Sequence, residues 1–231
     1  MDQGHTEQPN PVFVFDLDGT LVDSVYQHVL AWSEALQQGG ITLPNWRIHR
    51  LIGMSGGLIV HALSREAGRR ISLEEGTRLQ DLHGEIFAQH SADVRLLPGA
   101  KQLLHTLTQG GVRWGIATSG KKNKAQSSFD LLELDQNVPI VTRDDVQHAK
   151  PAPDLFEAAA EKMGVDLEDC IVVGDSVWDL LAAQRARALG VGLLTGGYGR
   201  EELMSAGAYR VYHDPAELAD HLEEMGVRAQ P

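Results

Sequence analysis

The sequence contains one cysteine, Cys170, and no run of apolar residues that approaches the length of a membrane span. A single cysteine excludes a structural disulfide within the chain, and its place in the apolar run 170–173 predicts a buried, small hydrophobic side chain. A transmembrane helix needs about 18 consecutive apolar residues. Residues 1–10 are polar and lack the apolar segment of a signal peptide. We therefore expect a cytoplasmic protein that has no membrane partner.

Positively charged residues are scarce as well. The chain has 20 Lys and Arg against 32 Asp and Glu, which gives a formal net charge of -12. No stretch is basic enough to neutralise a row of phosphates, so we expect no nucleic-acid partner. An acidic protein that handles an anionic substrate must concentrate positive charge locally, at a bound cation or at a few side chains.

Short apolar runs alternate with helical patterns along most of the 231 residues. The runs are 12–15, 112–117, 138–141, 170–173, 191–194 and 209–212. Most of them are continuously apolar, as strands buried on both faces are. The helical patterns between them cover 100–108, 123–134, 154–163 and 178–189. This alternation predicts an α/β fold with a Rossmann-like, doubly wound parallel sheet, whose ligands bind at the carboxyl ends of the strands.

The connection between the first two apolar runs is too long for a simple crossover. About ninety residues separate them, whereas a crossover between parallel strands needs only about a dozen. Helical periodicity covers 25–36, 58–66 and 73–89 within this connection. We therefore predict an inserted α-helical cap domain over 24–92 that covers the carboxyl edge of the sheet. The catalytic core is then predicted at 11–23 and 93–226, with flexible tails at 1–10 and 227–231.

Two aspartates, Asp16 and Asp18, follow the first apolar run and precede Gly19. Two carboxylates one residue apart at the end of a buried strand repel each other, and a cation between them removes that cost. One carboxylate can then act as nucleophile or ligand and the other as acid or base. Gly19 allows the chain to turn away sharply. The competing interpretation is a strand end closed by an Asp–Gly turn without chemical function.

Hydroxyl and amino groups follow the second and third runs. Thr118 and Ser119 come directly after 112–117, and a hydroxyl with free backbone N–H groups at a strand–helix junction suits an oxyanion. Lys150 lies in a loop that the following prolines, at 151 and 153, hold extended. Each pattern also occurs in ordinary loops and on ordinary surfaces.

A second acidic pair follows the run 170–173. Asp175 stands at the end of this run, and Asp179 lies one helical turn later on about the same face. This spacing suits oxygen ligation of a hard cation, directly and through supporting contacts. All four groups of polar residues fall at the predicted carboxyl ends of strands, which favours one common site.

In these positions the chain resembles the haloacid dehalogenase superfamily, in its phosphatase and beta-phosphoglucomutase-like branch with a helical type I cap. The stretch Asp-Leu-Asp-Gly-Thr-Leu-Val-Asp-Ser at 16–24 matches the first family motif. Thr118 matches the second, and Lys150 in its Lys-Pro-Ala-Pro-Asp context matches the third. Gly174-Asp175 with Asp179 matches the fourth. The resemblance implies a phosphoric monoester hydrolase.

The resemblance also implies a role for each of these residues. Asp16 attacks phosphorus and forms an aspartyl-phosphate, while Asp18 protonates the leaving oxygen and then activates water. Mg²⁺ contacts the carboxylates of Asp16 and Asp175 and the backbone carbonyl of Asp18, with Asp179 and Ser176 in support. The groups expected to hold the phosphoryl oxygens are Thr118, the Ser119 backbone and Lys150.

Substrate contacts are expected from the cap. His28 and Trp32 lie one turn apart on the helix that leaves the catalytic loop, and similar residues of beta-phosphoglucomutase-like members face the active site. Those members carry an arginine near the position where this chain has Gly56-Gly57, and this difference speaks against mutase activity. Further candidates for reaching the substrate are Arg47, Arg50 and His61.

Four other functions compete with a phosphohydrolase. A phosphomutase of the same branch is the nearest alternative. Dehalogenase members replace the second motif aspartate, which this chain keeps as Asp18. A signalling receiver module is shorter and has no cap, and a binding protein on an inactive scaffold would not need every motif residue. The expected partner is a small phosphorylated metabolite such as phosphoglycolate, a hexose phosphate or a nucleotide monophosphate, and both a monomer and a homodimer are compatible with the sequence.

Overall fold

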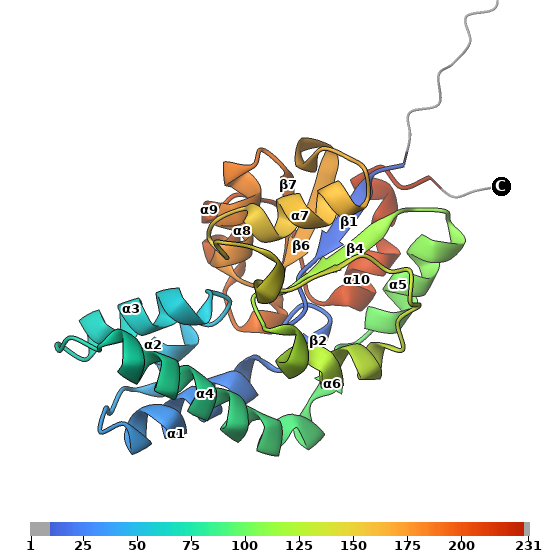
Figure 1. Cartoon of the computed structure of the whole chain (residues 1–231). Helices are drawn as coiled ribbons and strands as arrows, with labels where there is room; N and C mark the ends of the chain where they lie inside the picture. The colour runs from blue at the N-terminus through green and yellow to red at the C-terminus, as the bar shows by residue number, and fades with distance from the viewer. Residues whose placement is uncertain (1–9, 229–231) are drawn as a thin grey trace, which may run out of the picture.

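A parallel six-stranded sheet forms the centre of the computed structural model, which describes residues 10–228 (Figure 1). In spatial order its strands are β5 (Ile140–Val141), β4 (Trp114–Ala117), β1 (Val12–Phe15), β6 (Cys170–Gly174), β7 (Leu189–Leu193) and β8 (Ala208–Tyr212). All five neighbouring pairs are parallel. The predicted α/β fold is therefore confirmed, with β1 at the middle of the sheet.

Helices cover both faces of the sheet, which explains why the central strands are continuously apolar. Phe13 and Phe15 of β1 pack with α5 (Ala100–Gln109), α6 (Lys122–Leu132) and α10 (Pro215–Asp220). Val12 and Val14 point to the other face and pack with α7 (Asp154–Lys162) and α8 (Val177–Arg185). A further helix, α9 (Arg200–Ser205), packs beside β7 and β8. Alternate residues of one strand thus belong to two separate hydrophobic clusters.

Four helices form a separate body at the carboxyl edge of the sheet (Figure 1). They are α1 (Val25–Gln38), α2 (Asn45–His49), α3 (Gly56–Glu66) and α4 (Leu73–His90), and they share a hydrophobic cluster of their own. The chain enters this body after β2 (Val22–Asp23) and leaves it before β3 (Arg95–Leu96), and these two strands pair antiparallel. The division into a core and a cap over 24–92 stays a prediction.

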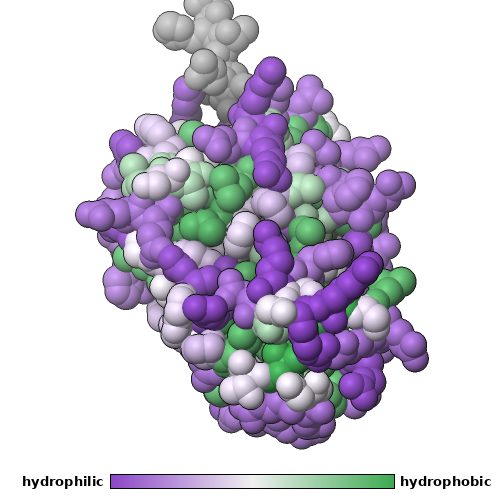
Figure 2. Space-filling model, turned by 90° about the vertical axis from the view of Figure 1, so that its left-hand side faces the viewer, coloured by the Kyte–Doolittle hydropathy of each residue, from purple (hydrophilic) through white to green (hydrophobic). Residues whose placement is uncertain are grey.

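Short 3-10 helices occupy several loops of the core. They cover Ser91–Asp93, Arg143–Asp145, Leu167–Asp169, Leu194–Gly196 and Leu222–Met225. Among residues 10–228, no helix is both long and apolar enough to cross a membrane. Figure 2 shows hydrophilic side chains over most of one face of the molecule, with apolar residues in smaller patches between them.

The sequence-based boundaries differ from the structure in several places. The helix predicted over 178–189 ends at Arg185, because Arg187 has a left-handed backbone (φ 59) and Leu189 already begins β7. The strand predicted over 138–141 is reduced to its last two residues. The short helices α2, α9 and α10 were not predicted, since five or six residues give too little periodicity. Of the predicted tails, residues 1–9 and 229–231 lie outside the described residues, and Val227 packs against the core.

Candidate active site

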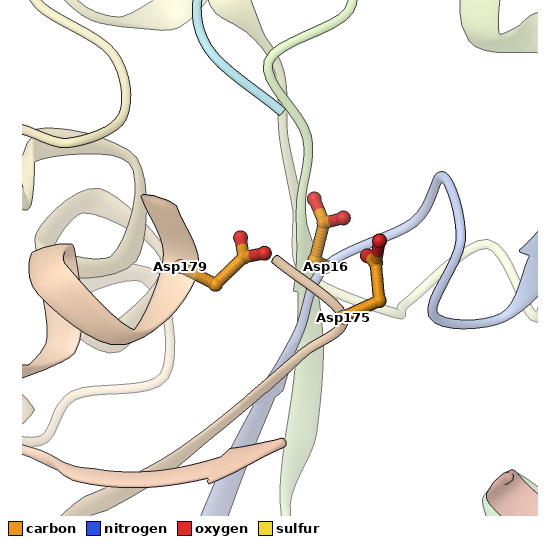
Figure 3. A group of neighbouring side chains, drawn as sticks. All are labelled: Asp16, Asp175 and Asp179. Carbon is orange, nitrogen blue, oxygen red and sulfur yellow. The ribbon is translucent and has the colours of Figure 1, made fainter. Parts of the chain in front are cut away.

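Three aspartates converge at the carboxyl edge of the sheet (Figure 3). Asp16 directly follows β1 and Asp175 directly follows its neighbour β6, so the two carboxylates lie side by side. Asp179 projects from the first turn of α8 toward both of them. Each residue offers one oxygen, and the three oxygens lie within 4.8 Å of one another. All three side chains are buried.

One lysine lies among these carboxylates. Lys150 is fully buried, and its ammonium group donates a hydrogen bond to Asp16 and lies 2.7 Å from Oδ1 of Asp179. Three carboxylates and one ammonium leave an excess of negative charge in a region with little water. Buried charges of this kind need compensation. An all-oxygen set of donors with excess negative charge fits a hard divalent cation such as Mg²⁺.

The pKa values show the same crowding of negative charge. Burial raises the pKa of Asp16 to about 7; the charge of Lys150 opposes this rise, and the charges of Asp179 and Asp18 add to it. Burial also raises the pKa of Asp175 well above its usual range, together with the charges of Asp179 and Asp16. A bound cation would favour the ionised form of both carboxylates.

Asp18 has different surroundings from Asp16, although only one residue separates them. Its Oδ1 accepts a hydrogen bond from Ser24 (2.6 Å) and lies 3.4 Å from Nε2 of His28, and its Oδ2 lies 3.4 Å from the hydroxyl of Thr118. Burial works to raise the pKa of Asp18, but the hydrogen bond and charge of His28 and the bond from Ser24 outweigh it and lower the pKa. The two carboxylates are thus suited to different tasks.

Gly19 makes this separation possible. Its φ of +84° lies in the left-handed region, where glycine is favoured, and a Cβ here would collide with the carboxylate of Asp175. The chain therefore turns away directly after Asp18, and the next residue, Thr20, donates a hydrogen bond of 2.9 Å to Asp175. No functional role was predicted for Thr20. The only signal for such a role in the sequence was its position within the stretch 16–24.

Asp179 is held by the loop that precedes α8. Its Oδ2 accepts hydrogen bonds from the hydroxyl (2.5 Å) and the backbone N–H (3.1 Å) of Ser176. These bonds close a capping box at the N-terminus of the helix. The cap leaves Oδ1 of Asp179 free to face Lys150 and the other carboxylates.

A cavity of about 480 Å³ lies between the sheet edge and the four-helix body. Asp16, Asp18, Thr118 and Ser119 line it from the core. His28 and Trp32 line it from α1. Lys150, Asp175 and Asp179 are not among the residues that line the cavity; they lie behind Asp16. Asp16 is therefore the one member of the acidic cluster that the cavity exposes in the described part of the chain.

Stacked rings form the wall of the cavity above Asp18. His28 stacks on Phe87 at 3.9 Å between ring centroids, and Trp32 stacks on His83 at 4.4 Å. Nδ1 of His28 lies 3.1 Å from Nε2 of His83. His83 was not predicted as a site residue, because α4 and α1 are far apart in the chain and only their packing brings the two histidines together. Burial and the charge of His28 lower the pKa of His83 well below its usual value.

A second set of contacts fixes the four-helix body to the core on the far side of the cavity. The hydroxyl of Ser119 donates to the carbonyl of Gly53 (3.1 Å). The carbonyl of Arg50 accepts bonds from Trp178 (3.2 Å) and Tyr198 (3.1 Å), and the guanidinium of Arg50 pairs with Glu202. Arg50 is thus engaged away from the cavity. The other two candidates also lie elsewhere: Arg47 pairs with Glu66, and His61 is exposed on α3.

A protein-family model described as haloacid dehalogenase-like hydrolase matches residues 11–187. A phosphoglycolate phosphatase from Rhodospirillum rubrum is 31% identical over 216 residues, which cover 90% of this chain and 89% of that protein. Hexitol phosphatase A from Escherichia coli is 31% identical over 175 residues, which cover 75% and 78% of the two chains. Relatives of this similarity establish the family.

Solved structures of other proteins show the same fold. A hydrolase from Pseudomonas syringae is 52% identical, with a TM-score of 0.91, over 94% of this chain and 99% of the other. A putative beta-phosphoglucomutase from Bacteroides vulgatus has a TM-score of 0.83 at 23% identity, over 95% of this chain and 91% of the other. At that identity the second likeness is evidence for the fold alone.

The buried carboxylates make the metal-free protein sensitive to pH. The pKa of Asp16 is about 7 in the folded state against 3.8 for a free side chain. Between these values the folded state keeps a proton that the unfolded state has released. The contribution of protonated Asp16 to the free energy of unfolding is therefore full below about pH 4 and is lost as the pH rises through 7. In EDTA, we expect Asp16→Asn to gain stability over the wild type between pH 5 and 8, by roughly 2–4 kcal/mol, in urea unfolding.

The stability difference between the two proteins cancels the groups that titrate alike in both, such as His83, whose lowered pKa makes stability rise with pH. Asp175 does not cancel fully, because the charge of Asp16 contributes to its raised pKa; the loss of this charge in Asp16→Asn adds to the expected gain. The matched control is Asp169→Asn, at the exposed amino end of β6, which should leave the pH dependence unchanged. A stability difference that stays constant from pH 5 to 8 would show that Asp16 is ionised throughout.

Proposed function

The chain belongs to the haloacid dehalogenase-like hydrolase family and is a phosphatase, and we propose that it hydrolyses small phosphorylated metabolites through an aspartyl-phosphate on Asp16, with Mg²⁺ as its cofactor. The substrates are phosphoglycolate-like or sugar-phosphate-like esters, as the names of the relatives suggest. The observation that carries this proposal is the contrast between Asp16 and Asp18. One carboxylate belongs to a buried cluster of three carboxylates that could hold a cation, and the other is held by hydroxyl and imidazole groups beside the same cavity.

The reaction follows from the placement of these two carboxylates. For the first step Asp18 must carry a proton, although His28 and Ser24 lower its pKa before substrate binds; the negative charge of the bound phosphoryl group favours uptake of that proton. An oxygen of Asp16 attacks phosphorus, and the bond to the ester oxygen breaks while Asp18 gives its proton to that oxygen. Asp18, now ionised, then takes a proton from a water molecule that attacks the phosphorus of the aspartyl-phosphate. The phosphate departs, and both carboxylates return to their starting forms. The contacts of Ser24 and His28 with Asp18 hold it in place for both proton transfers.

Charge on the phosphoryl oxygens must be neutralised during both steps. The carboxylates of Asp16 and Asp175 and the backbone carbonyl of Asp18, with support from Asp179, would hold Mg²⁺, which would supply positive charge at this point. Lys150 adds its own positive charge directly behind Asp16. The hydroxyl of Thr118 and the backbone N–H of Ser119, at the end of β4, complete the set of groups that hold the phosphoryl oxygens.

The four-helix body is proposed to act as a cap over this site. It has its own hydrophobic cluster, its chain enters and leaves through the antiparallel pair of β2 and β3, and it forms one wall of the cavity. Closure of such a body excludes bulk water and brings His28 and Trp32 against the substrate. The phosphomutase alternative has no observation in its favour beyond the fold, and both curated relatives compared are named as phosphatases.

Removal of the nucleophile is the direct test. We expect Asp16→Asn to fold but to retain less than about 1% of the wild-type kcat, a barrier increase of about 3 kcal/mol or more, because an amide cannot attack phosphorus. Acid-quenched wild-type enzyme should carry phosphate on the peptide that contains Asp16, detected by mass spectrometry. Asp169→Asn serves again as the control and should keep full activity. Higher residual activity, with deamidation excluded by mass, would contradict covalent catalysis by Asp16.

Metal removal tests the cofactor. EDTA should abolish turnover and Mg²⁺ should restore it. Ca²⁺ should bind, as measured by a rise in Tm, without supporting turnover, because the larger ion accepts more ligands in looser geometry and would chelate Asp16. Full activity in metal-free buffer would reject the proposed cofactor and would favour dehalogenase-like chemistry.

The contact between His28 and Asp18 gives a third test. In His28→Ala, we expect kcat/KM for an alkyl phosphate to fall about tenfold more than kcat/KM for p-nitrophenyl phosphate, because a good leaving group needs little protonation. The control is His61→Ala, which removes an exposed histidine of the same body. Equal losses on both substrates would mean that His28 only supports folding.

A further inference from the structure

Cations line the cavity as well as the carboxylates of Asp16 and Asp18. Three of these cations come from the core: Lys121, Lys124 and Arg143. Two further acidic residues, Asp81 and Asp144, also line the cavity. Asp144 is engaged locally, since its Oδ2 accepts a hydrogen bond of 3.0 Å from the backbone N–H of Lys122.

Lys124 is the cation that lies against the four-helix body. It projects from the first turn of α6 and its side chain lies across α4 at Gly84. A Cβ on Gly84 would fall 2.8 Å from Cε and 2.9 Å from Nζ of Lys124, so a larger residue here would displace the end of the lysine side chain. Glycine inside a helix is unfavourable relative to alanine, and at this position it leaves room for Lys124.

The ammonium group of Lys124 has no carboxylate partner in the described structure. No ion pair within 4.0 Å joins it to any residue of 10–228. Arg143, by contrast, donates to the backbone carbonyls of Val146 and Gln147, and this fixes its guanidinium. Lys124 is an exposed side chain at the wall of the cavity, and its donors are available. Its positive charge can attract an anion that is bound in the cavity.

We propose that Lys124, in the space that Gly84 leaves, binds an anionic group at the far end of the substrate. The enzyme then prefers phosphate esters that carry a second acidic group, such as a carboxylate, over neutral esters of the same length. This inference rests on the proposed phosphatase function and narrows its substrate class. The phosphoryl group binds at Asp16 and the second anion at Lys124, and both residues line the same cavity.

The experiment uses substrate pairs that differ only in this second charge. One pair is 2-phosphoglycolate and 2-hydroxyethyl phosphate, and the other is 6-phosphogluconate and sorbitol 6-phosphate. We expect the wild type to prefer the acid of at least one pair. In Lys124→Met, which keeps the length of the side chain, kcat/KM for that acid should fall about tenfold or more, mainly through KM, while the alcohol changes less than about twofold.

Two further variants separate the proposal from a general effect of charge or folding. Lys122→Met removes an exposed lysine from the same turn of α6 that does not line the cavity, and both members of each pair should keep their kcat/KM within about twofold. Gly84→Ala should weaken the preference for the acid while Lys124 is still present, because the new methyl group displaces the lysine.

The outcomes distinguish this inference from the proposed function. Hydrolysis of p-nitrophenyl phosphate with no preference for either acid would overturn the inference and leave the phosphatase intact. An acid preference that survives in Lys124→Met, or equal losses on acid and alcohol, would overturn it as well. Absence of Mg²⁺-dependent turnover on every phosphate ester would instead contradict the proposed function.

Discussion

Crowding of negative charge at the carboxyl edge of the sheet is the constraint on which the rest of the structure depends. Asp16, Asp175 and Asp179 bring three carboxylates within a few ångströms in a buried region, and within residues 10–228 Lys150 is the one cation that pairs with them. Such a cluster is unfavourable unless positive charge is added or protons are taken up. Burial raises the pKa values of Asp16 and Asp175, and the charges of the neighbouring carboxylates raise them further.

The fold holds the cluster together in spite of this repulsion. β1 and β6 are neighbours, buried on both faces between two hydrophobic clusters, so the residues that follow them are fixed by the core. Hydrogen bonds from Thr20 to Asp175 and from Ser176 to Asp179 orient the carboxylates further. The stability of the hydrophobic layers thus offsets the electrostatic cost of a preformed site for a cation and an anionic substrate.

The same edge of the sheet separates two environments. The carboxylate cluster lies behind Asp16, whereas Asp18 faces histidine and hydroxyl groups beside the cavity. The rings of the four-helix body form the wall above Asp18, and its Gly84 leaves room for Lys124. In the proposed function, the core supplies the reacting groups, and the contact between the core and the helices decides what lies next to them.

The sequence by itself determined the sheet, the order of its strands along the chain and the placement of Asp16, Thr118 and Asp175 at strand ends. These features repeat a local pattern, an apolar run followed by a polar residue, that can be recognised without knowing the neighbours. Only the tertiary structure decided that His28 meets His83, that Lys150 lies behind Asp16, and that Lys124 lies against Gly84. Such pairs depend on how helices pack across the cavity. The periodicity of each helix gives the face that is buried, but it does not specify the partner that this face will meet.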